Sequence, residues 1–562
     1  MTQQQPEIQV KDINHLGIIA GLIDQMGWVE AVNELVGTHS LEQVSTGQVL
    51  KAMILNGLGF VSAPLYLFSQ FFEGKATEHL LGEGVKPEYL NDDRLGRALD
   101  KFYKVGVTQL FTILAMKAVK QCGVNFSSIH LDSSSFHVDG EYLSDSSEDS
   151  AVRKEDSPTT DESANARDLA ADEPKTITIT HGYSRDHRPD LKQFVVNTIC
   201  TADGDVPLFL RVADGNQDDK TAFAKLLAEF REQWTFDSLC VADSALYTAD
   251  NLIAMKQLKW LTRVPLTLTQ AKVALLEIQA SEWITSNQKG YRIAERHSQY
   301  GGVSQRWFIV ESQQRKQADI QQLHKRIDKE HKQLSAQLRQ LSAQVFACEP
   351  DACSAAVKFE QSLKYHRLED LKFIPQAHYD KAGRPRQAEE PIRITYQIQA
   401  TLIANLEVLD IEMTRAGRFI LATNVLDAGQ LSADDALKEY KDQQSNERGF
   451  RFLKDPLFFT SSVFVKSSQR VESLVMVMAL CLLVYCLAQR QLRQALEQAG
   501  EGIKNQVGKL TMRPTMRWVF QSFQSVHLLT LDGVKQITNL TPERCNILYF
   551  LGTPALRYYQ LC

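Results

Sequence analysis

The chain has 562 residues, of which 44% are hydrophobic and 23% are charged. This is the composition of an ordinary globular protein, so a wholly disordered chain is excluded. The 62 Lys and Arg against 68 Asp and Glu give a net charge of −6, and this average alone does not indicate a nucleic-acid binder, since such proteins usually carry a basic surplus. At roughly 150 residues per domain, the length predicts about three or four domains.

Two features bear on where the protein acts. The nine cysteines are odd in number and scattered along the chain, which predicts reduced, buried thiols in a cytoplasmic protein and not a disulfide framework. Residues 474–488 form an uncharged run, but as a helix it would span roughly 22 Å, less than the ~30 Å hydrocarbon core of a membrane. We therefore expect a buried helix and no membrane partner.

Residues 1–122 carry the pattern of a helical domain. The segment 44–47 offers an N-cap before apolar residues at helical spacing, and Asn91 precedes a second such pattern. In that second helix Arg94 and Arg97 lie three residues apart. This spacing suits either a phosphate backbone or a solvated surface.

From residue 123 the pattern changes to strands. Short apolar or β-branched runs predict strands over 127–132, 176–180, 194–200, 207–212, 239–242 and 260–264. Helices are expected over 220–233 and 248–258. A run of strands followed by alternating helix and strand indicates an α+β fold with a mixed sheet.

Two segments interrupt this core. Residues 145–173 hold ten acidic and three basic residues and almost no large apolar side chain, which predicts a flexible acidic loop. Residues 266–416 form a larger insert with a hairpin candidate that turns at Gly301 and Gly302. A long polar helix from Ile320 to Val345 either pairs with another helix or lies on its own domain. The insert closes with strands at 392–400 and 419–423.

Three carboxylates stand where a metal-dependent site would need them. Asp132 ends the first strand, Asp243 ends a later strand, and Glu447 lies in a helical stretch from about 432 to 453. Carboxylates at strand ends can converge at one sheet edge and bind Mg²⁺ or Mn²⁺, and two such ions clamp the attacking and leaving oxygens of a phosphoryl transfer. In the alternative interpretation, the two aspartates cap the turns that follow them and Glu447 is a surface charge.

The residues around these acids resemble the DDE class of insertion-sequence transposases, in the branch whose third acid lies in a Tyr-x2-Arg-x3-Glu-x6-Lys block. Here the block consists of Tyr440, Gln443, Glu447 and Lys454, with every spacing kept and glutamine in place of arginine. The segments 90–99, 129–135, 181–193 and 241–245 are also similar to the family. The resemblance extends over about residues 10 to 530.

The resemblance implies an RNase H-like catalytic core that holds two Mg²⁺ or Mn²⁺ ions on Asp132, Asp243 and Glu447. Such a transposase cuts a transposable element at its terminal inverted repeats and joins it to target DNA. It is expected to act as a homodimer in a synaptic complex and to be associated with the nucleoid when bound to DNA.

The resulting prediction divides the chain into five segments. They are a helical DNA-binding domain (1–122), the first part of the RNase H-like core (123–265, with the acidic loop 145–173), an insertion domain (266–416), the last part of the core with the third acid (417–465), and a helical region for DNA binding or dimerisation (466–562).

DNA contacts are expected from the block and from two basic segments. Tyr440 and Lys454 inherit from the resemblance a role beside the scissile phosphate, whereas Gln443 can hydrogen-bond to a phosphate but supplies no charge. Either DNA contact or a solvated surface explains the remaining cations, which are Arg185, Arg188, Lys192, Arg513 and Arg517. Tyr247 either stacks on a base or packs at a helix start.

Two other functions remain open from the sequence. One is an RNase H-like nuclease that cuts DNA without joining it. The other is a catalytically silent DNA-binding derivative, although the intact spacing of the block favours an active enzyme.

Overall fold

The structure is a computed structural model. It describes residues 8–60, 67–138, 176–183, 188–217, 225–231, 237–380, 390–443 and 467–560. The chain forms two compact units. Unit 1 comprises residues 1–262, 301–303 and 438–562, and unit 2 comprises residues 263–300 and 304–437.

The first part of unit 1 is helical, as the sequence predicts. Its helices are α1 (Leu16–Gln25), α2 (Trp28–Val36), α3 (Thr46–Gly57), α4 (Phe68–Phe72), α5 (Thr77–Leu81), the 3-10 turn η2 (Pro87–Tyr89), α6 (Asp92–Val105) and α7 (Val107–Cys122). Both predicted helix starts are confirmed. Ser45 and Gln48 form a reciprocal capping box at α3, and the Asn91 side chain accepts a hydrogen bond from the Arg94 backbone amide.

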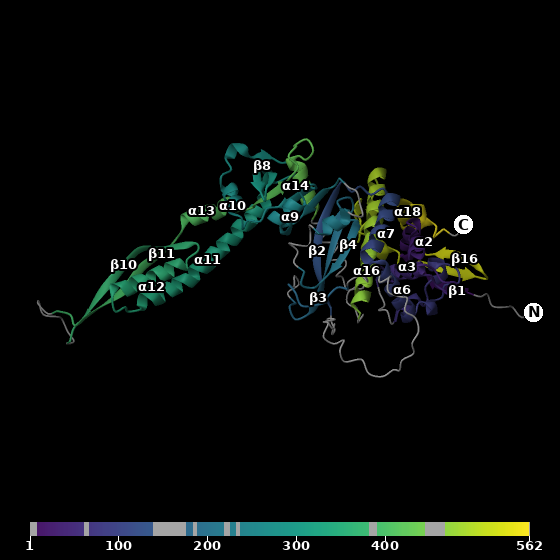
Figure 1. Ribbon diagram of the computed structural model, residues 1–562, viewed down its shortest axis with the longest axis horizontal. Coiled ribbons are helices and arrows are strands. Elements are labelled where there is room, and N and C mark those ends of the chain that lie inside the picture. Colours follow the sequence, from purple (N-terminus) through teal and green to yellow (C-terminus); the bar gives the residue numbers. More distant parts are fainter. Residues whose placement is uncertain are drawn as a thin grey trace, which may run out of the picture. The chain divides into compact units, whose positions relative to one another are not determined.

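The uncharged run lies in α16 (Ser468–Ala499), a helix of 32 residues. Among the described residues this helix alone is long and apolar enough to cross a membrane, but 94% of its apolar window is buried inside the protein. It contacts α3, α6 and α7, and it also contacts β4 of the sheet described below (Figure 1). The expected buried helix is therefore confirmed.

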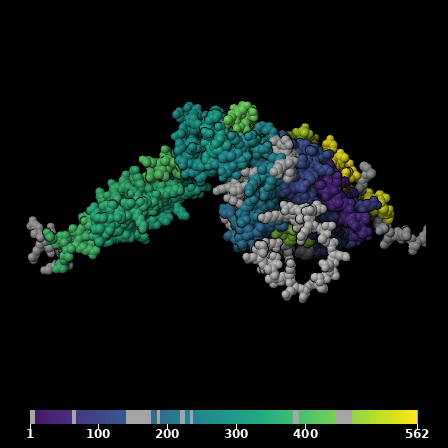
Figure 2. Space-filling view, in the orientation of Figure 1, coloured from purple at the N-terminus to yellow at the C-terminus, as the bar shows by residue number. Residues whose placement is uncertain are grey.

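The last part of the chain packs against the first part. Helix α17 (Met516–Ser522) is followed by strands β15 (His527–Leu531) and β16 (Val534–Thr538), and β15 pairs antiparallel with β1 (Ile8–Asp12). Helices α18 (Pro542–Leu551) and α19 (Thr553–Leu556) follow, and α19 contacts α1. The space-filling view shows the purple N-terminal and yellow C-terminal residues against each other (Figure 2).

The segments 1–122 and 466–562 lie in the same compact unit. The prediction that the C-terminal segment is helical needs correction. The C-terminal segment also contains four short strands, β13 (Ile503–Lys504), β14 (Leu510–Thr511), β15 and β16. Strands β13 and β14 have two residues each, too few to show a period, and β15 pairs with β1, more than 500 positions away in the sequence.

The sheet of unit 1 has the order β4-β3-β2-β5-β6. Its strands are β2 (Ser128–Val138), β3 (Lys192–Thr201), β4 (Pro207–Ala213), β5 (Leu239–Ala242) and β6 (Lys259–Arg263). Strands β2, β3 and β4 are antiparallel neighbours, whereas β2, β5 and β6 run parallel. This is the mixed sheet of the RNase H-like core that the sequence predicts. The short elements η4 (Ser244–Leu246) and α9 (Ala249–Ala254) connect β5 to β6.

Two strand predictions differ from the structure. The first strand continues six residues past Asp132 to Val138, because β3 pairs with it along ten positions. The predicted strand 176–180 reduces to a single bridge between Thr180 and Gln193.

Unit 2 contains the predicted hairpin and long helix. Strands β7 (Ile284–Thr285), β8 (Tyr291–Tyr300) and β9 (Val303–Ser312) precede α11 (Gln313–Ala343), and β12 (Arg418–Thr423) pairs with β9. Gly301 and Gly302 turn the hairpin with positive φ, as expected. The remaining helices are α10 (Thr269–Leu276), η5 (Ala280–Glu282), α12 (Glu349–Gln361), α13 (Leu406–Arg415) and α14 (Ala433–Asp442), whose last residues belong to unit 1.

The long helix packs within its own unit. Helix α11 contacts β11 (Arg393–Ala404), which pairs with β10 (His366–His378) in a two-stranded ribbon. Ala352, Ala356 and Ile398 form the buried centre of this packing, with Leu341 of α11 against them. Of the two interpretations left open for the long helix, pairing with another helix or lying on its own domain, the structure shows the second.

Candidate active site

Asp132 lies in the middle of β2, where the neighbouring strand β5 has already ended. Its side chain is partly buried, and its Oδ1 accepts a hydrogen bond from the backbone N–H of Ser133 at 2.8 Å. The two flanking side chains, Leu131 and Ser133, are buried. Strand alternation thus presents the carboxylate on one face while its neighbours fix the strand.

Asp243 follows the last residue of β5 in extended conformation, and its side chain is exposed. Its Oδ1 accepts a hydrogen bond from the Ala245 backbone N–H at 2.9 Å, and its own carbonyl accepts one from Thr262 Oγ1 at 2.6 Å. The turn therefore holds the Asp243 carboxylate, and the adjacent strand β6 holds its backbone carbonyl. Asp243 therefore caps the turn that follows it, as the alternative interpretation predicted, and it also lies at the sheet edge where β5 ends.

The register of the sheet places Asp132 and Asp243 at equivalent positions along the neighbouring strands β2 and β5. Strands β2 and β5 are parallel, with His130 opposite Val241. Asp132 and Asp243 each lie two residues beyond this pair, so they follow it on the same face. Adjacent strands are about 4.8 Å apart. The backbone register therefore places Asp132 and Asp243 next to each other at the carboxyl end of β5.

Gln443 meets this edge from the end of the α14 segment. Its Nε2 donates a hydrogen bond to the carbonyl of Leu131 at 3.4 Å. This carbonyl lies at the point where β2 extends past the end of β5. The side chain thus ties the segment that leads toward the third predicted acid to the residue before Asp132. Tyr440, one turn earlier, is partly buried.

Three predicted site residues lie outside the described residues: Glu447, Lys454 and Arg185. The structure therefore shows two of the three predicted acids and two residues of the four-residue block.

The other predicted DNA contacts are distributed over unit 1. Arg188 is exposed and forms an ion pair with Asp190 at 2.8 Å, and this hydrogen bond keeps the pKa of Asp190 below its usual value. Lys192 begins β3, and Arg513 and Arg517 flank the start of α17. Tyr247 is only 3% exposed, so the packed alternative is the observed one.

The donor set suits a hard cation. The carboxylates of Asp132 and Asp243 offer oxygen ligands of the kind that Mg²⁺ and Mn²⁺ prefer. Among the described residues no group of three His, Cys, Asp or Glu could hold a metal ion, and the third predicted ligand, Glu447, lies outside them. The buried imidazole of His130 has its pKa lowered to about 4 by burial and is neutral at physiological pH.

One positioning residue was missed by the sequence analysis. Thr262 of β6 is fully buried and holds the Asp243 backbone through its hydroxyl. A lone threonine in an apolar strand carries no signal of this role, because the contact depends on the parallel pairing of β5 with β6.

Comparisons with known proteins identify the family of this chain. The family model described as "Transposase DDE domain" matches residues 145–484, which include Asp243 and the block and begin after Asp132. A "Domain of unknown function (DUF4277)" matches residues 8–116. No curated protein matches the chain.

A solved structure also aligns with most of the chain. It is titled a cryo-EM structure of the piggyBac transposase synaptic complex with hairpin DNA, and the alignment covers 93% of this chain and 83% of that one at 9% identity. The TM-score is 0.34, which is too low to support an argument. The family model alone matches more than half of the chain, and the protein belongs to the DDE transposases.

Proposed function

We propose that this protein cuts an insertion sequence at its terminal inverted repeats and joins it to target DNA by two-metal-ion phosphoryl transfer. The observation that supports the proposal is the backbone register of β2 and β5: Asp132 and Asp243 each lie two residues beyond the pair of His130 and Val241. Glu447 is the proposed third ligand. It lies four residues after Gln443 in the sequence.

Each residue has a defined task in this proposal. Bound divalent ions supply Lewis-acid activation of the attacking hydroxyl and of the scissile phosphate. Asp132 and Asp243 provide the oxygen ligands, Thr262 fixes the backbone of Asp243, and Gln443 holds the α14 segment against β2. Tyr440, Lys454, Arg185, Arg188, Lys192, Arg513 and Arg517 are proposed to contact DNA.

The partners and location follow from this activity. The proposed partners are the terminal inverted repeats and the target DNA, handled by a homodimer because two element ends are processed together. The proposed location is the bacterial cytoplasm, at the nucleoid.

The test uses purified protein, Mg²⁺ and labelled DNA that carries the element's own ends. Nicking and joining are expected in the wild type and are expected to disappear in Asp132→Asn, Asp243→Asn and Glu447→Gln. Asn at 243 keeps an oxygen that can accept the bond from Ala245, so lost activity there does not report a lost turn. Asp250→Asn, an exposed acid on α9, is the matched control.

The outcomes separate the alternatives. Cleavage that survives the three substitutions contradicts the catalytic assignment. Cleavage without joining indicates a nuclease, and binding without cleavage indicates a silent DNA-binding derivative.

A further inference from the structure

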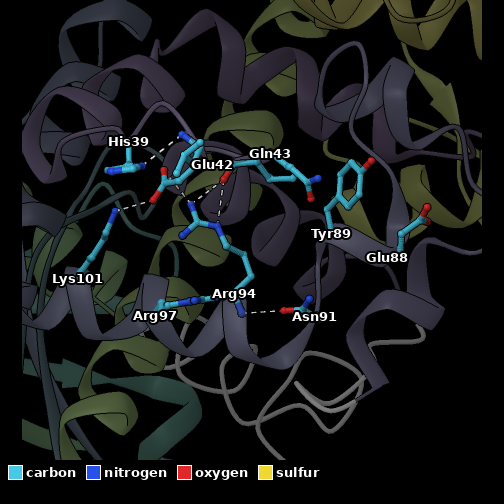
Figure 3. Close-up of a pocket in the computed structure, with 11 residues that line it drawn as sticks. His39, Glu42, Gln43, Glu88, Tyr89, Asn91, Arg94, Arg97 and Lys101 are labelled. Carbon is cyan, nitrogen blue, oxygen red and sulfur yellow. Dashed lines mark hydrogen bonds and ion pairs between the residues drawn. The ribbon is translucent and has the colours of Figure 1, made fainter.

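A polar pocket lies in the N-terminal part of unit 1, away from the residues assigned to catalysis. It has a volume of about 420 Å³ and lies between the loop that follows α2, the η2 turn and helix α6 (Figure 3). Four of its lining residues repeat every three or four positions along α6, and these are Asn91, Arg94, Arg97 and Lys101. This spacing places them on one face of the helix. The volume is in the range of small-ligand sites.

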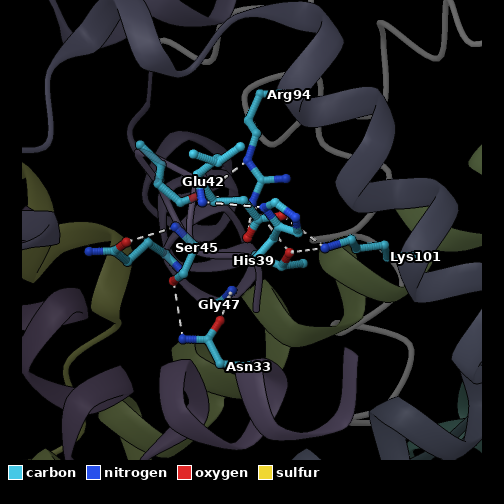
Figure 4. Close-up of polar contacts among 11 residues, drawn as sticks. Asn33, His39, Glu42, Ser45, Gly47, Arg94 and Lys101 are labelled. Atoms are coloured by element: carbon cyan, nitrogen blue, oxygen red, sulfur yellow. Dashed lines mark hydrogen bonds and ion pairs between the residues drawn. The ribbon is translucent and has the colours of Figure 1, made fainter. Parts of the chain in front are cut away.

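Arg94 holds the wall of the pocket. Its guanidinium donates two hydrogen bonds to the Val44 carbonyl, at 3.0 and 2.6 Å, and one to Thr46 Oγ1 at 3.3 Å (Figure 4). Asn33 also binds the segment that contains Val44 and Thr46, because its amide oxygen accepts a hydrogen bond from the Gly47 N–H at 2.8 Å. The Arg94 guanidinium is thus occupied by hydrogen bonds within the protein. Of the two explanations that the sequence allowed for Arg94, a DNA phosphate and a solvated surface, the structure shows neither.

Glu42 is the partly buried acid of the pocket, and two cations neutralise its charge. Glu42 forms ion pairs with Lys101 at 3.0 Å and with Arg94 at 3.3 Å. Burial opposes ionisation of Glu42, but the Lys101 hydrogen bond and the two positive charges outweigh it, so its pKa is lowered. Glu42 is therefore ionised, but its single negative charge is already paired with Arg94 and Lys101, so it does not balance a third cation.

Arg97 is that third cation. Its side chain is exposed, and no hydrogen bond or ion pair engages it within the described part of the chain. It lies close enough to Arg94 for their charges to repel each other. An exposed arginine beside another arginine on the wall of a pocket can pair with an anion, and guanidinium groups favour phosphate.

The opposite wall has a different chemistry. Figure 3 shows Tyr89 and Gln43 near each other, apart from Lys101. The Tyr89 ring is partly exposed and offers a flat apolar face, and the Gln43 amide offers both a donor and an acceptor. Glu88, exposed beside Tyr89, disfavours a second phosphate on this side. One wall therefore suits a single phosphate and the other a planar polar ring.

We propose that this pocket binds one nucleotide, with its phosphate on Arg97 and its base against Tyr89. The nucleotide is either a unit of a DNA strand or a free mononucleotide, and both present the same chemistry. The site goes beyond the proposed catalytic function and gives the N-terminal domain a ligand. It is tested by binding alone, so loss of strand cleavage would leave it standing.

The experiment measures binding to the full chain by titration calorimetry with three probes: inorganic phosphate, dAMP and a short single-stranded DNA. Arg97→Gln removes the charge without removing a contact within the protein, and it is expected to weaken dAMP or strand binding by about ten-fold. Tyr89→Leu keeps an apolar side chain without the ring and is expected to weaken the same probes by about five-fold or more, with no effect on phosphate. Lys104→Gln, exposed on the same helix and outside the pocket, is the matched control.

The outcomes are decisive in both directions. Binding of dAMP that depends on Arg97 and Tyr89 supports a free nucleotide as ligand, and the same dependence with the strand alone supports a nucleotide within DNA. The proposal is overturned if neither probe responds to Arg97→Gln, if Lys104→Gln has an equal effect, or if Tyr89→Leu weakens phosphate as much as dAMP. Unchanged thermal unfolding of each variant shows that the fold is retained.

Discussion

At the scale of single residues, several charged and titratable side chains are fixed by partners far away in the sequence. Lys51 is only 4% exposed, yet it pairs with Asp24 at 2.6 Å and donates to Tyr558 Oη at 2.9 Å. Glu472 of α16 is 9% exposed and accepts a hydrogen bond from the Ile177 backbone N–H at 3.0 Å. Such groups connect the start, middle and end of the chain, and their burial makes the stability of unit 1 depend on pH.

Glu472→Gln is expected to stabilise the protein at pH 8. Burial is the main cause that raises the pKa of Glu472 from 4.5 to about 7. A raised carboxyl pKa means that the folded state binds the proton more tightly, so stability is full below pH 4.5 and is lost as the pH rises toward 7. Above pH 7 the loss is about 3 kcal/mol. Glutamine keeps an acceptor for Ile177 and does not ionise.

Thermal unfolding of wild type and variant between pH 4 and pH 8 checks this. The two melting temperatures should agree most closely at pH 4 and differ most at pH 8, with the variant higher. Glu497→Gln, at the exposed end of the same helix, should follow the wild type. A constant difference across the pH range would contradict the assignment.

Gln443→Arg is expected to keep or raise strand-transfer activity. The glutamine contributes one long hydrogen bond to the Leu131 carbonyl, which an arginine can also donate. Arginine would add the charge that the block pattern has at this position, and a charged fork binds a DNA phosphate more strongly than an amide. A strand-transfer assay with the element's own ends measures the change. A clear loss would show that glutamine has a role of its own here.

At the scale of elements, local signals predicted what local contacts determine. The caps at Ser45 and Asn91, the glycine turn at 301–302 and the apolar strand before Asp243 all appear in the structure. Elements that depend on pairing with distant residues were either not predicted, as for β15, or predicted with the wrong ends, as for β2. Strand β10 was not predicted, because ten of its thirteen residues are exposed and no apolar alternation marks it. The same limit applies to the site. The sequence placed both aspartates at strand ends, whereas Asp132 lies in the middle of β2, and only the register shows that it lies opposite Asp243.

Gly21→Ala is expected to destabilise the contact between α1 and α19. Alanine in a helix interior is normally favoured over glycine by up to about 1 kcal/mol. At this position, however, a Cβ atom would lie 2.0 Å from the Pro554 carbonyl oxygen, which belongs to the backbone and cannot turn aside. Overpacking of this kind costs roughly 1–3 kcal/mol.

The sign of the change in melting temperature decides the matter, because helix propensity and steric clash predict opposite effects. A lower melting temperature and faster proteolysis after residue 540 are expected for the variant. A higher melting temperature would show that the C-terminal segment does not pack on α1 as closely as the structure has it.

At the scale of the whole molecule, the net charge of −6 is an average over unlike segments. Residues 145–173 carry ten acids and three bases, whereas residues 451–562 carry thirteen Lys and Arg against six Asp and Glu. Without the acidic segment the chain would be close to neutral, and its C-terminal part is distinctly basic. Because screening limits charge effects to about 10 Å at 0.1 M salt, the distribution says more than the total about binding to DNA.

Deletion of residues 145–173 is therefore expected to tighten non-specific DNA binding at low salt. The segment begins thirteen residues after Asp132 in the sequence, and we propose that it competes with DNA for the basic surfaces of unit 1. Affinity for a duplex without the element's ends, measured across a salt series, should rise most at the lowest salt, because the effect is electrostatic. A variant in which the ten acids are replaced by Asn and Gln keeps the length and should behave like the deletion. If only the deletion tightens binding, the segment acts through its length, and unchanged affinity in both variants would make it a spacer.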